Sequence, residues 1–177
     1  FLGIFDPFKK VFAESPAARD KGYKPSHFSF LSKDGQCPEC GGAGSIPVSL
    51  DYWADAQVTC HSCHGQRFKP EVLDIKIGGL SIADLLDQPF SAMKDFASGH
   101  FAHKERTSLL RALELAEKTG LGYLPLGQPL STLSTGEMQR LKLAAGLGES
   151  HAPECLFLLD EPTGGLHPRD IAGLLNL

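Results

Sequence analysis

The sequence predicts an α/β fold together with a region that holds a metal ion. Two features carry this prediction. Two Cys-x2-Cys pairs lie between residues 37 and 63, and a capped helix near residue 134 precedes a short apolar run that ends in two acids. A continuous apolar run of this kind is typical of a strand buried in a parallel sheet. The 177 residues suffice for one domain, or for one domain and part of another.

The composition favours a soluble globular protein over a membrane-spanning, secreted or strongly basic one. Hydrophobic residues make up 42% and charged residues 21%, as in an ordinary soluble globular protein, and no apolar run is long enough to cross a membrane. The sequence shows no secretory leader pattern, so we expect a cytoplasmic protein. The formal net charge of −4 argues against a dedicated nucleic-acid binder with a basic face.

The remaining elements are expected from residue periodicity and turn signals. Residues 1–36 are expected to be mostly irregular, with a short helix near residues 7–14. The apolar residues in 70–80 predict a strand. A helix is expected to begin at the Ser81 cap, and a longer packing helix over residues 104–118 is expected to end at Gly120.

The cysteine pairs indicate a structural zinc site. A tetrahedral zinc site needs two ligand pairs on tight turns, which a hairpin can bring together. Each pair is followed two positions later by a glycine, Gly42 or Gly65, which lets the backbone fold round a metal. The spacing lies in the range typical of zinc. The hairpin is expected to span residues 37–68, with strands at 45–50 and 57–59, and the expected ligands are Cys37, Cys40, Cys60 and Cys63.

Several alternatives stay open for this region. The cysteines could form two disulfides, which would need an oxidising compartment. His61 and His64 lie beside the second pair and could compete as ligands, although four thiolates already close a tetrahedral site. Tyr52 and Trp53 lie near the hairpin turn, where an aromatic ring either stacks on a nucleic-acid base or packs on its own hairpin.

Residues 134–144 indicate a helix whose start can bind an anion. Ser134 is followed three residues later by Glu137, which is the pattern of a capping box. The first amides of such a helix have no intrahelical acceptor and lie at the positive end of the helix dipole, so they suit a phosphate. The same pattern occurs in helices that bind nothing, and this segment alone favours that interpretation.

The segment after this helix supplies two acids. Residues 155–159 form a continuous apolar run, which is followed by Asp160 and Glu161. In phosphate-loop ATPases a carboxylate at this place holds Mg²⁺, and an adjacent carboxylate can act on the attacking water. No G-x-x-x-x-G-K-[ST] phosphate loop occurs in the 177 residues, so the chain is expected to be an excised piece that is inactive alone.

These segments together resemble the ATP-binding-cassette (ABC) ATPases. Residues 134–140 resemble the signature motif of that family, residues 156–161 its Walker B strand, and residues 163–167 the D-loop that follows. More narrowly, the chain resembles the C-terminal half of the UvrA family, the damage sensors of bacterial nucleotide excision repair. This resemblance also covers the four-cysteine region and residues 22–30, 65–68, 82–87, 120–123 and 126–129.

The resemblance implies a division into domains. It implies an α/β fold in which a partial ABC-type ATPase domain carries a zinc-bearing α+β insertion, the signature domain. Residues 1–126 would form the insertion domain. Residues 127–177 would form part of the nucleotide-binding domain, with the signature helix, Walker B strand and D-loop but no Walker A loop.

The resemblance also implies cofactors, partners and roles. The complete protein would use ATP and Mg²⁺, with Asp160 helping to hold the ion and Glu161 positioning or deprotonating the attacking water. Implied partners are duplex DNA, especially damaged DNA, a UvrB-like protein and a second copy of the complete protein, and no membrane is implied. The residues that would contact the γ-phosphate of ATP held elsewhere are Ser134, Thr135, Gly136 and Glu137.

Two other functions fit part of the sequence. The family usually has glycine where this chain has Thr135, and it includes paralogues in drug resistance or regulation, so such a paralogue is the first alternative. The second is a non-enzymatic zinc module, because the segment from Cys37 to Gly44 resembles the repeat of DnaJ-type chaperones. That module has several repeats, whereas Arg67 breaks the second copy here, and it leaves residues 130–167 unexplained.

Overall fold

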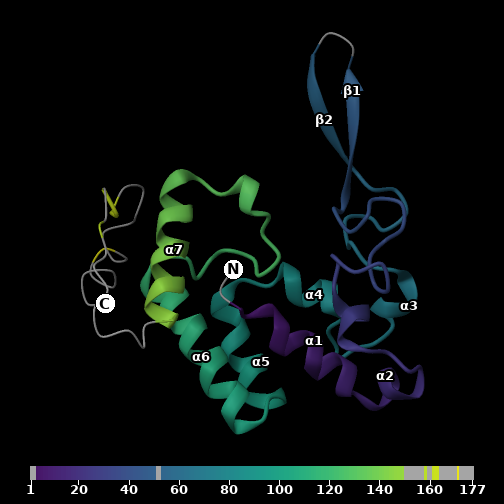
Figure 1. Cartoon of the computed structure of the whole chain (residues 1–177), viewed down its shortest axis with the longest axis horizontal. Coiled ribbons are helices and arrows are strands. Elements are labelled where there is room, and N and C mark those ends of the chain that lie inside the picture. Colours follow the sequence, from purple (N-terminus) through teal and green to yellow (C-terminus); the bar gives the residue numbers. More distant parts are fainter. Residues whose placement is uncertain (1–2, 51–52, 150–157, 159–160, 164–170, 172–177) are drawn as a thin grey trace. The chain divides into compact units, whose positions relative to one another are not determined.

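The chain is described by a computed structural model that covers residues 3–50, 53–149, 158, 161–163 and 171. It divides into two compact units, of which one consists of residues 8–84 and the other of residues 1–7 and 85–177. The unit of residues 8–84 combines short helices with a hairpin, the other unit is mainly helical, and the sheet formed by the described residues has two strands (Figure 1). Among the described residues, no helix has the length and apolar character that a membrane span requires.

The core of residues 8–84 is built from aromatic side chains. Phe12 and Phe28 are fully buried with ring centroids 5.4 Å apart, and Phe30 meets the buried Phe68 edge to face at 6.2 Å. Aromatic pairs at such distances add to the stabilisation from apolar burial. Because Phe28 and Phe30 precede the first cysteine pair and Phe68 follows the second, this packing joins the two ends of the cysteine region.

Short helices surround this core. α1 (Phe5–Glu14) matches the helix expected near residues 7–14. The rest of residues 1–36 is more helical than predicted, because α2 (Pro16–Asp20) and the 3-10 helix η1 (Pro25–Phe28) follow it. Both begin with a proline at the first helical position, and the Ser15 hydroxyl caps α2 by accepting a hydrogen bond from the Ala18 N–H at 3.3 Å.

The predicted strand over residues 70–80 is wrong. Pro70 instead opens the short helix α3 (Pro70–Leu73), and Val72 and Ile75 are buried. A proline at a helix start has its φ preset and needs no partner for an N–H, which outweighs the apolar pattern. The helix expected at the Ser81 cap is confirmed as α4 (Ile82–Asp87), since the Ser81 hydroxyl accepts from the Asp84 N–H at 3.2 Å.

The hairpin consists of β1 (Ser45–Leu50) and β2 (Trp53–Thr59), which pair antiparallel. The first strand has the predicted bounds, and the second begins four residues earlier than the predicted residue 57. In Figure 1 the two strands extend away from the rest of their unit as an arm. Val48 and Val58 are 39% and 52% exposed, as expected for a two-stranded sheet with no layer over it.

The second unit consists mainly of three helices, with short 3-10 helices before the first and before the last of them. The 3-10 helix η2 (Phe90–Ala92) leads into α5 (Met93–His100), which is followed by α6 (His103–Lys118), the 3-10 helix η3 (Leu130–Thr132) and α7 (Thr135–Glu149). α6 packs against both α5 and α7, and its apolar face is buried, which confirms the packing helix predicted for residues 104–118. The buried side chains of this face and of α7 include Leu109, Leu113, Ala116, Leu141 and Ala144.

The connection between α6 and α7 is tied to the segment that precedes α5. The Phe90 N–H donates to the Leu124 carbonyl at 3.0 Å, and the Gly127 N–H donates to the Leu86 carbonyl at 2.7 Å. A Cβ at Gly127 would lie 2.8 Å from the Leu86 Cβ, so only glycine permits this approach without displacement. These bonds fix the path of residues 121–129, which lead to the start of α7.

Candidate functional site

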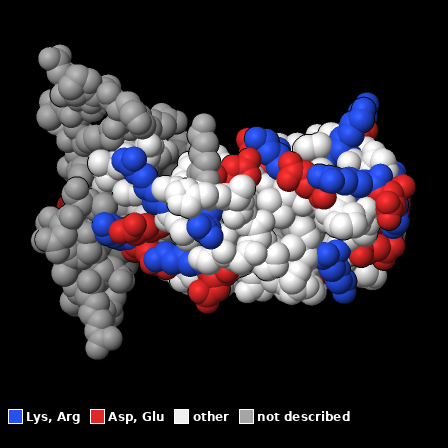
Figure 2. Space-filling model, turned by 90° about the horizontal axis from the view of Figure 1, so that it is seen from below, with Lys and Arg blue, Asp and Glu red and all other residues white. Residues whose placement is uncertain are grey.

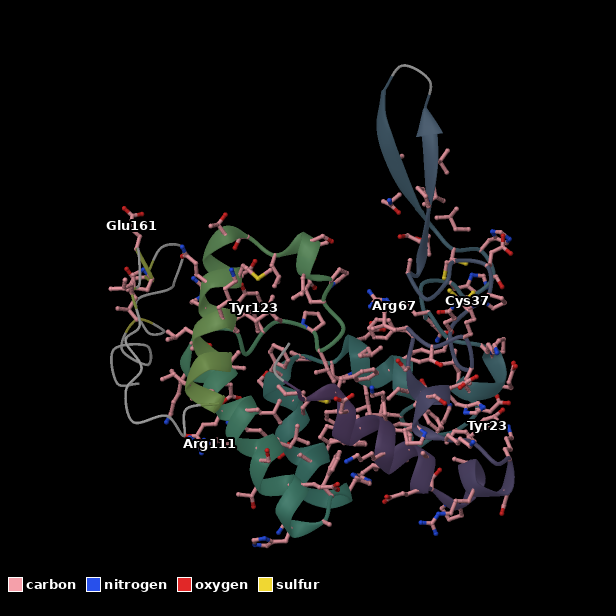
Figure 3. The ribbon with its side chains drawn as sticks, viewed as in Figure 1. Tyr23, Cys37, Arg67, Arg111, Tyr123 and Glu161 are labelled. Carbon is pink, nitrogen blue, oxygen red and sulfur yellow. The ribbon has the colours of Figure 1, made fainter. Side chains whose placement is uncertain are left out.

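The four cysteine sulfurs converge at the base of the hairpin (Figure 3). All four Sγ atoms lie within 4.8 Å of one another, with 4.0 Å between Cys37 and Cys60 and 3.6 Å between Cys40 and Cys63. These separations exclude disulfide bonds in this structure, since such bonds are about 2.05 Å long. Sulfurs placed about 2.3 Å from a tetrahedral zinc ion lie about 3.8 Å apart. The geometry therefore fits a four-thiolate metal site.

Backbone hydrogen bonds hold each cysteine pair in a tight turn. The His64 N–H donates to the Cys60 carbonyl at 2.8 Å, and the Ala43 N–H donates to the Cys40 carbonyl at 3.0 Å. The Gly44 N–H donates to the Cys40 Sγ at 3.2 Å, the kind of outer contact that orients a metal ligand. The Cys60 N–H donates to the Gly44 carbonyl at 3.0 Å, so the two turns are joined where the hairpin strands begin and end.

The thiols differ in how readily they ionise. Burial acts to raise the pKa of Cys37, but the backbone N–H groups of Cys40 and Glu39 donate to its sulfur and lower the pKa to about 7. Burial raises the pKa of Cys63 to about 12. Because zinc binds thiolates, loading the site requires the Cys63 proton to leave, and the affinity for zinc falls as pH falls.

The structure describes the two histidines beside the cysteines, but it does not describe the aromatic side chains at the hairpin turn. His61 and His64 are exposed, and the only metal-competent cluster among the described residues consists of the four cysteines. A histidine ligand is therefore not supported by the geometry. Tyr52 lies outside the described residues, and so does the side chain of Trp53, although its backbone begins β2. The choice between base stacking and hairpin packing at the turn stays untested.

Two adjacent glycines in the first cysteine turn offer a matched pair of substitutions. Gly42 has a φ of +84°, and a Cβ there would lie 1.8 Å from the Phe30 carbonyl oxygen. Gly41 has a φ of +59°, but a Cβ there would meet nothing within 4 Å. We expect Gly42→Ala to lower the free energy of unfolding by more than about 2 kcal/mol and Gly41→Ala by about 1 kcal/mol. Urea unfolding of the zinc-loaded chain measures both, and equal losses would contradict the close approach to Phe30.

The predicted capping box is present at the start of α7. The Ser134 hydroxyl accepts from the Glu137 N–H at 3.3 Å, and the Glu137 carboxylate accepts from the Ser134 N–H at 2.7 Å. Ser134 and Thr135 are exposed, while Gly136 and Glu137 are half-buried, so a ligand can reach this turn. Thr135 is the first residue of the helix, and because its side chain is exposed it does not disturb the packing of α7.

Tyr123 contacts this helix start, although the sequence had suggested no role for it. Its hydroxyl donates to the Glu137 carboxylate. This bond and the Ser134 N–H lower the pKa of Glu137, whereas burial and the neighbouring carboxylate raise the pKa of Tyr123. Tyr123 lies 14 residues before Glu137 and in a loop, so no helical or strand period in the sequence links the two residues.

Only part of the acidic segment can be compared with the prediction. Asp160 lies outside the described residues, as do residues 155–157, 159 and 164–167. Glu161 is exposed and has a φ of +43°, a left-handed conformation that is costly for a residue other than glycine (Figure 3). Backbone strain of this kind is concentrated at functional sites, although it does not identify one.

The predicted buried strand is not confirmed at Leu158, the one residue of that run that the structure describes. Leu158 is 88% exposed and belongs to no strand. A strand of a parallel sheet is buried by neighbouring strands and covering helices, whereas the described strands are only β1 and β2, which pair with each other. The described residues therefore confirm the zinc-competent mixed region but not the α/β ATPase part of the predicted fold.

Charge does not mark a nucleic-acid surface on the face shown in Figure 2. Lys and Arg are interspersed there with Asp and Glu, rather than gathered into a patch of one sign. This distribution agrees with the net charge of −4 and gives no direct sign of a DNA interface on that face.

Comparison with curated proteins gives matches along the whole chain. No family model matches the chain. Proteins named UvrABC system protein A from Thermus thermophilus, Micrococcus luteus and Methanothermobacter thermautotrophicus are 43%, 41% and 41% identical to it over all 177 residues. These 177 residues span only 17% to 18% of the length of those relatives.

A solved structure gives the same result. The crystal structure of UvrA2 from Deinococcus radiodurans matches 99% of this chain, and 20% of its own length, with a TM-score of 0.87 and 39% sequence identity. Sequence identity at this level, together with the shared fold, supports the resemblance on which the sequence-based interpretation rests. The chain therefore belongs to the UvrA family, as a segment that corresponds to less than a fifth of the length of its curated relatives.

Proposed function

We propose that this chain is the segment of a UvrA-like ABC ATPase that carries its zinc hairpin and its ATP signature. The complete protein then binds DNA, recognises damage in nucleotide excision repair and couples ATP binding and hydrolysis to DNA inspection. The observation that carries the proposal is the match with UvrABC system protein A at 43% identity over the whole chain. The four-sulfur cluster and the capped start of α7 support it, because a four-thiolate metal site and an anion-binding helix start are what the resemblance implies.

The proposed roles follow from the chemistry of each site. Zinc held by four thiolates has no open position for a water molecule, so it stabilises the hairpin and takes no part in catalysis. The Ser134 hydroxyl and the first amides of α7 contact the γ-phosphate of ATP that another part of the assembly holds. Asp160 helps to hold Mg²⁺, and Glu161 positions or deprotonates the attacking water.

The domain boundary and the partners are part of the same proposal. Residues 1–126 form the insertion domain, and residues 127–177 form part of the nucleotide-binding domain. The complete protein acts as a homodimer in the cytoplasm, binds duplex DNA and engages a UvrB-like partner. Support for these statements comes from family membership alone. This chain spans only 18% of the relative from Thermus thermophilus, so the complete protein's partners involve segments that lie outside it.

Binding to damaged DNA tests the proposal directly. We expect the complete protein to bind a damaged duplex roughly tenfold more tightly than an intact duplex of the same sequence, because damage changes the shape and deformability of the helix. Binding should weaken as salt rises, since contacts with phosphates release counterions. Fluorescence anisotropy across a salt series, before and after zinc removal, measures both effects. The intact duplex is the control, and equal affinity for the two duplexes would contradict damage recognition.

A UvrA-like paralogue in drug resistance or regulation is the second candidate. Two observations favour it: Thr135 stands where the family usually has glycine, and the matched solved structure is named UvrA2. This candidate retains ATP turnover but has no preference for damaged DNA. A complete protein that hydrolyses ATP and binds no duplex would therefore favour the paralogue over the repair protein.

A further inference from the structure

The start of α7 presents an electrostatic problem for a phosphate ligand. Amides at a helix N-terminus attract anions, but Glu137 already places a carboxylate in the first turn of this helix. A free carboxylate would compete with a phosphate for the same donors and would repel its charge. The helix start therefore suits a phosphate only if the Glu137 carboxylate is held away from the amides of Thr135 and Gly136.

Hydrogen bonds engage both oxygens of that carboxylate. Glu137 Oε2 accepts from the Ser134 N–H at 2.7 Å, and Glu137 Oε1 accepts from the Tyr123 hydroxyl. Arg140 is buried one turn further along α7, and its positive charge also favours the ionised form of Glu137. The Glu137 N–H itself points to the Ser134 hydroxyl at 3.3 Å, so the amides of Thr135 and Gly136 are the donors left for an external anion.

The position of Tyr123 is set by its neighbours rather than by burial of its own ring. Leu124, the next residue, is buried, and its carbonyl accepts from the Phe90 N–H at 3.0 Å. The Tyr123 residue itself is 61% exposed, which is unusual for an aromatic side chain that serves only packing. A tyrosine whose neighbour in the chain is anchored, and whose hydroxyl is used on one carboxylate, is suited to orienting that carboxylate.

We propose that Tyr123 is a positioning residue of the signature helix, because its hydroxyl holds the Glu137 carboxylate and thereby leaves the Thr135 and Gly136 amides open to a phosphate. The inference rests on the proposed ATP function of α7. It gives Tyr123 no contact with the nucleotide, since it acts through Glu137.

The first test uses the 177-residue chain and needs no nucleotide. Carbon NMR of the Glu137 carboxylate gives its pKa in the unchanged chain and in Tyr123→Phe. The Tyr123 hydroxyl is the largest of the influences on that pKa and lowers it, so Tyr123→Phe should raise the pKa of Glu137. Tyr23→Phe is the matched control, because Tyr23 belongs to the other compact unit, where its ring stacks on His27. An unchanged pKa of Glu137 in Tyr123→Phe overturns the proposal.

The second test separates positioning from general stability in the complete protein. Tyr123→Phe should raise KM for ATP about threefold or more with little change in kcat, the effect of losing one charge-assisted hydrogen bond. The same substitution on a Glu137→Gln background should have no further effect, because no carboxylate charge remains to be held. Equal effects on the two backgrounds overturn the positioning role. If the unchanged complete protein hydrolyses no ATP, the proposed function fails, whereas the NMR result still decides whether Tyr123 holds Glu137.

Discussion

Replacing Cys60 with alanine is expected to abolish zinc binding and to unfold much of residues 8–84. Cys60 is fully buried, and its Sγ lies 4.0 Å from the Cys37 Sγ within the four-sulfur cluster. Three ligands leave the tetrahedral site open, and the cluster also anchors both strands of the hairpin. Structural zinc contributes about 10–16 kcal/mol in small zinc peptides at neutral pH, which is comparable with the whole stability of a domain at about 5–15 kcal/mol.

Metal analysis and limited proteolysis check this expectation together. The unchanged chain should contain one zinc ion per molecule, while Cys60→Ala should contain none and be cleaved rapidly within residues 8–84. His61→Ala is the matched control, since His61 is the neighbouring residue, is exposed and lies outside the sulfur cluster. Full zinc content in Cys60→Ala would contradict the four-thiolate site, and loss of zinc in His61→Ala would show that a histidine is a ligand.

Replacing Glu161 with glutamine is expected to stop ATP turnover in the complete protein while leaving ATP binding intact. The amide has the same shape as the carboxylate but cannot accept a proton from water, and general-base catalysis contributes about 10²- to 10⁴-fold to rate. Glu161 is exposed, so the substitution should not affect folding. The expected result is a fall in kcat of that order without a comparable change in affinity for ATP.

Phosphate release and binding of a fluorescent ATP analogue measure the two properties separately. Glu114→Gln is a suitable control, because Glu114 is an exposed acid of α6 whose carboxylate pairs with Lys118 at 2.9 Å. It should change neither turnover nor binding. Unchanged turnover in Glu161→Gln would remove Glu161 from the catalytic assignment and would leave its left-handed backbone without a functional explanation.

The features that could be predicted from the sequence are those formed by residues that lie close together along the chain. The cysteine pairs are each three residues apart, the hairpin between them brings the pairs together, and the structure confirms the cluster. The cap of α7 is equally local, because Ser134 and Glu137 lie on one helical turn. In both cases the residue spacing and the chemistry of the side chains agree on one geometry.

The predictions that fail depend on contacts that the local pattern does not contain. Residues 70–80 have the apolar content of a strand, but Pro70 starts a helix, and Val72 and Ile75 are buried without a strand around them. The buried strand expected at Leu158 is not confirmed, because it would need neighbouring strands that the described residues do not provide. Tyr123 could not be identified because its partner is reached only through the fold of the α6–α7 connection.

The two strands of the hairpin are attached directly to the turns that hold the four cysteines. Strand β1 begins one residue after Gly44, and β2 ends one residue before Cys60, so both strands enter the metal turns directly. Six residues of extended chain form a lever about 20 Å long, so a rotation of about 10° at its base moves the far end by roughly 3.5 Å. A small change in the angles between the sulfur atoms would therefore produce a larger displacement at the outer end of β1. When the four sulfurs hold a metal ion, the rigidity of its coordination would set how precisely the outer end of β1 is positioned.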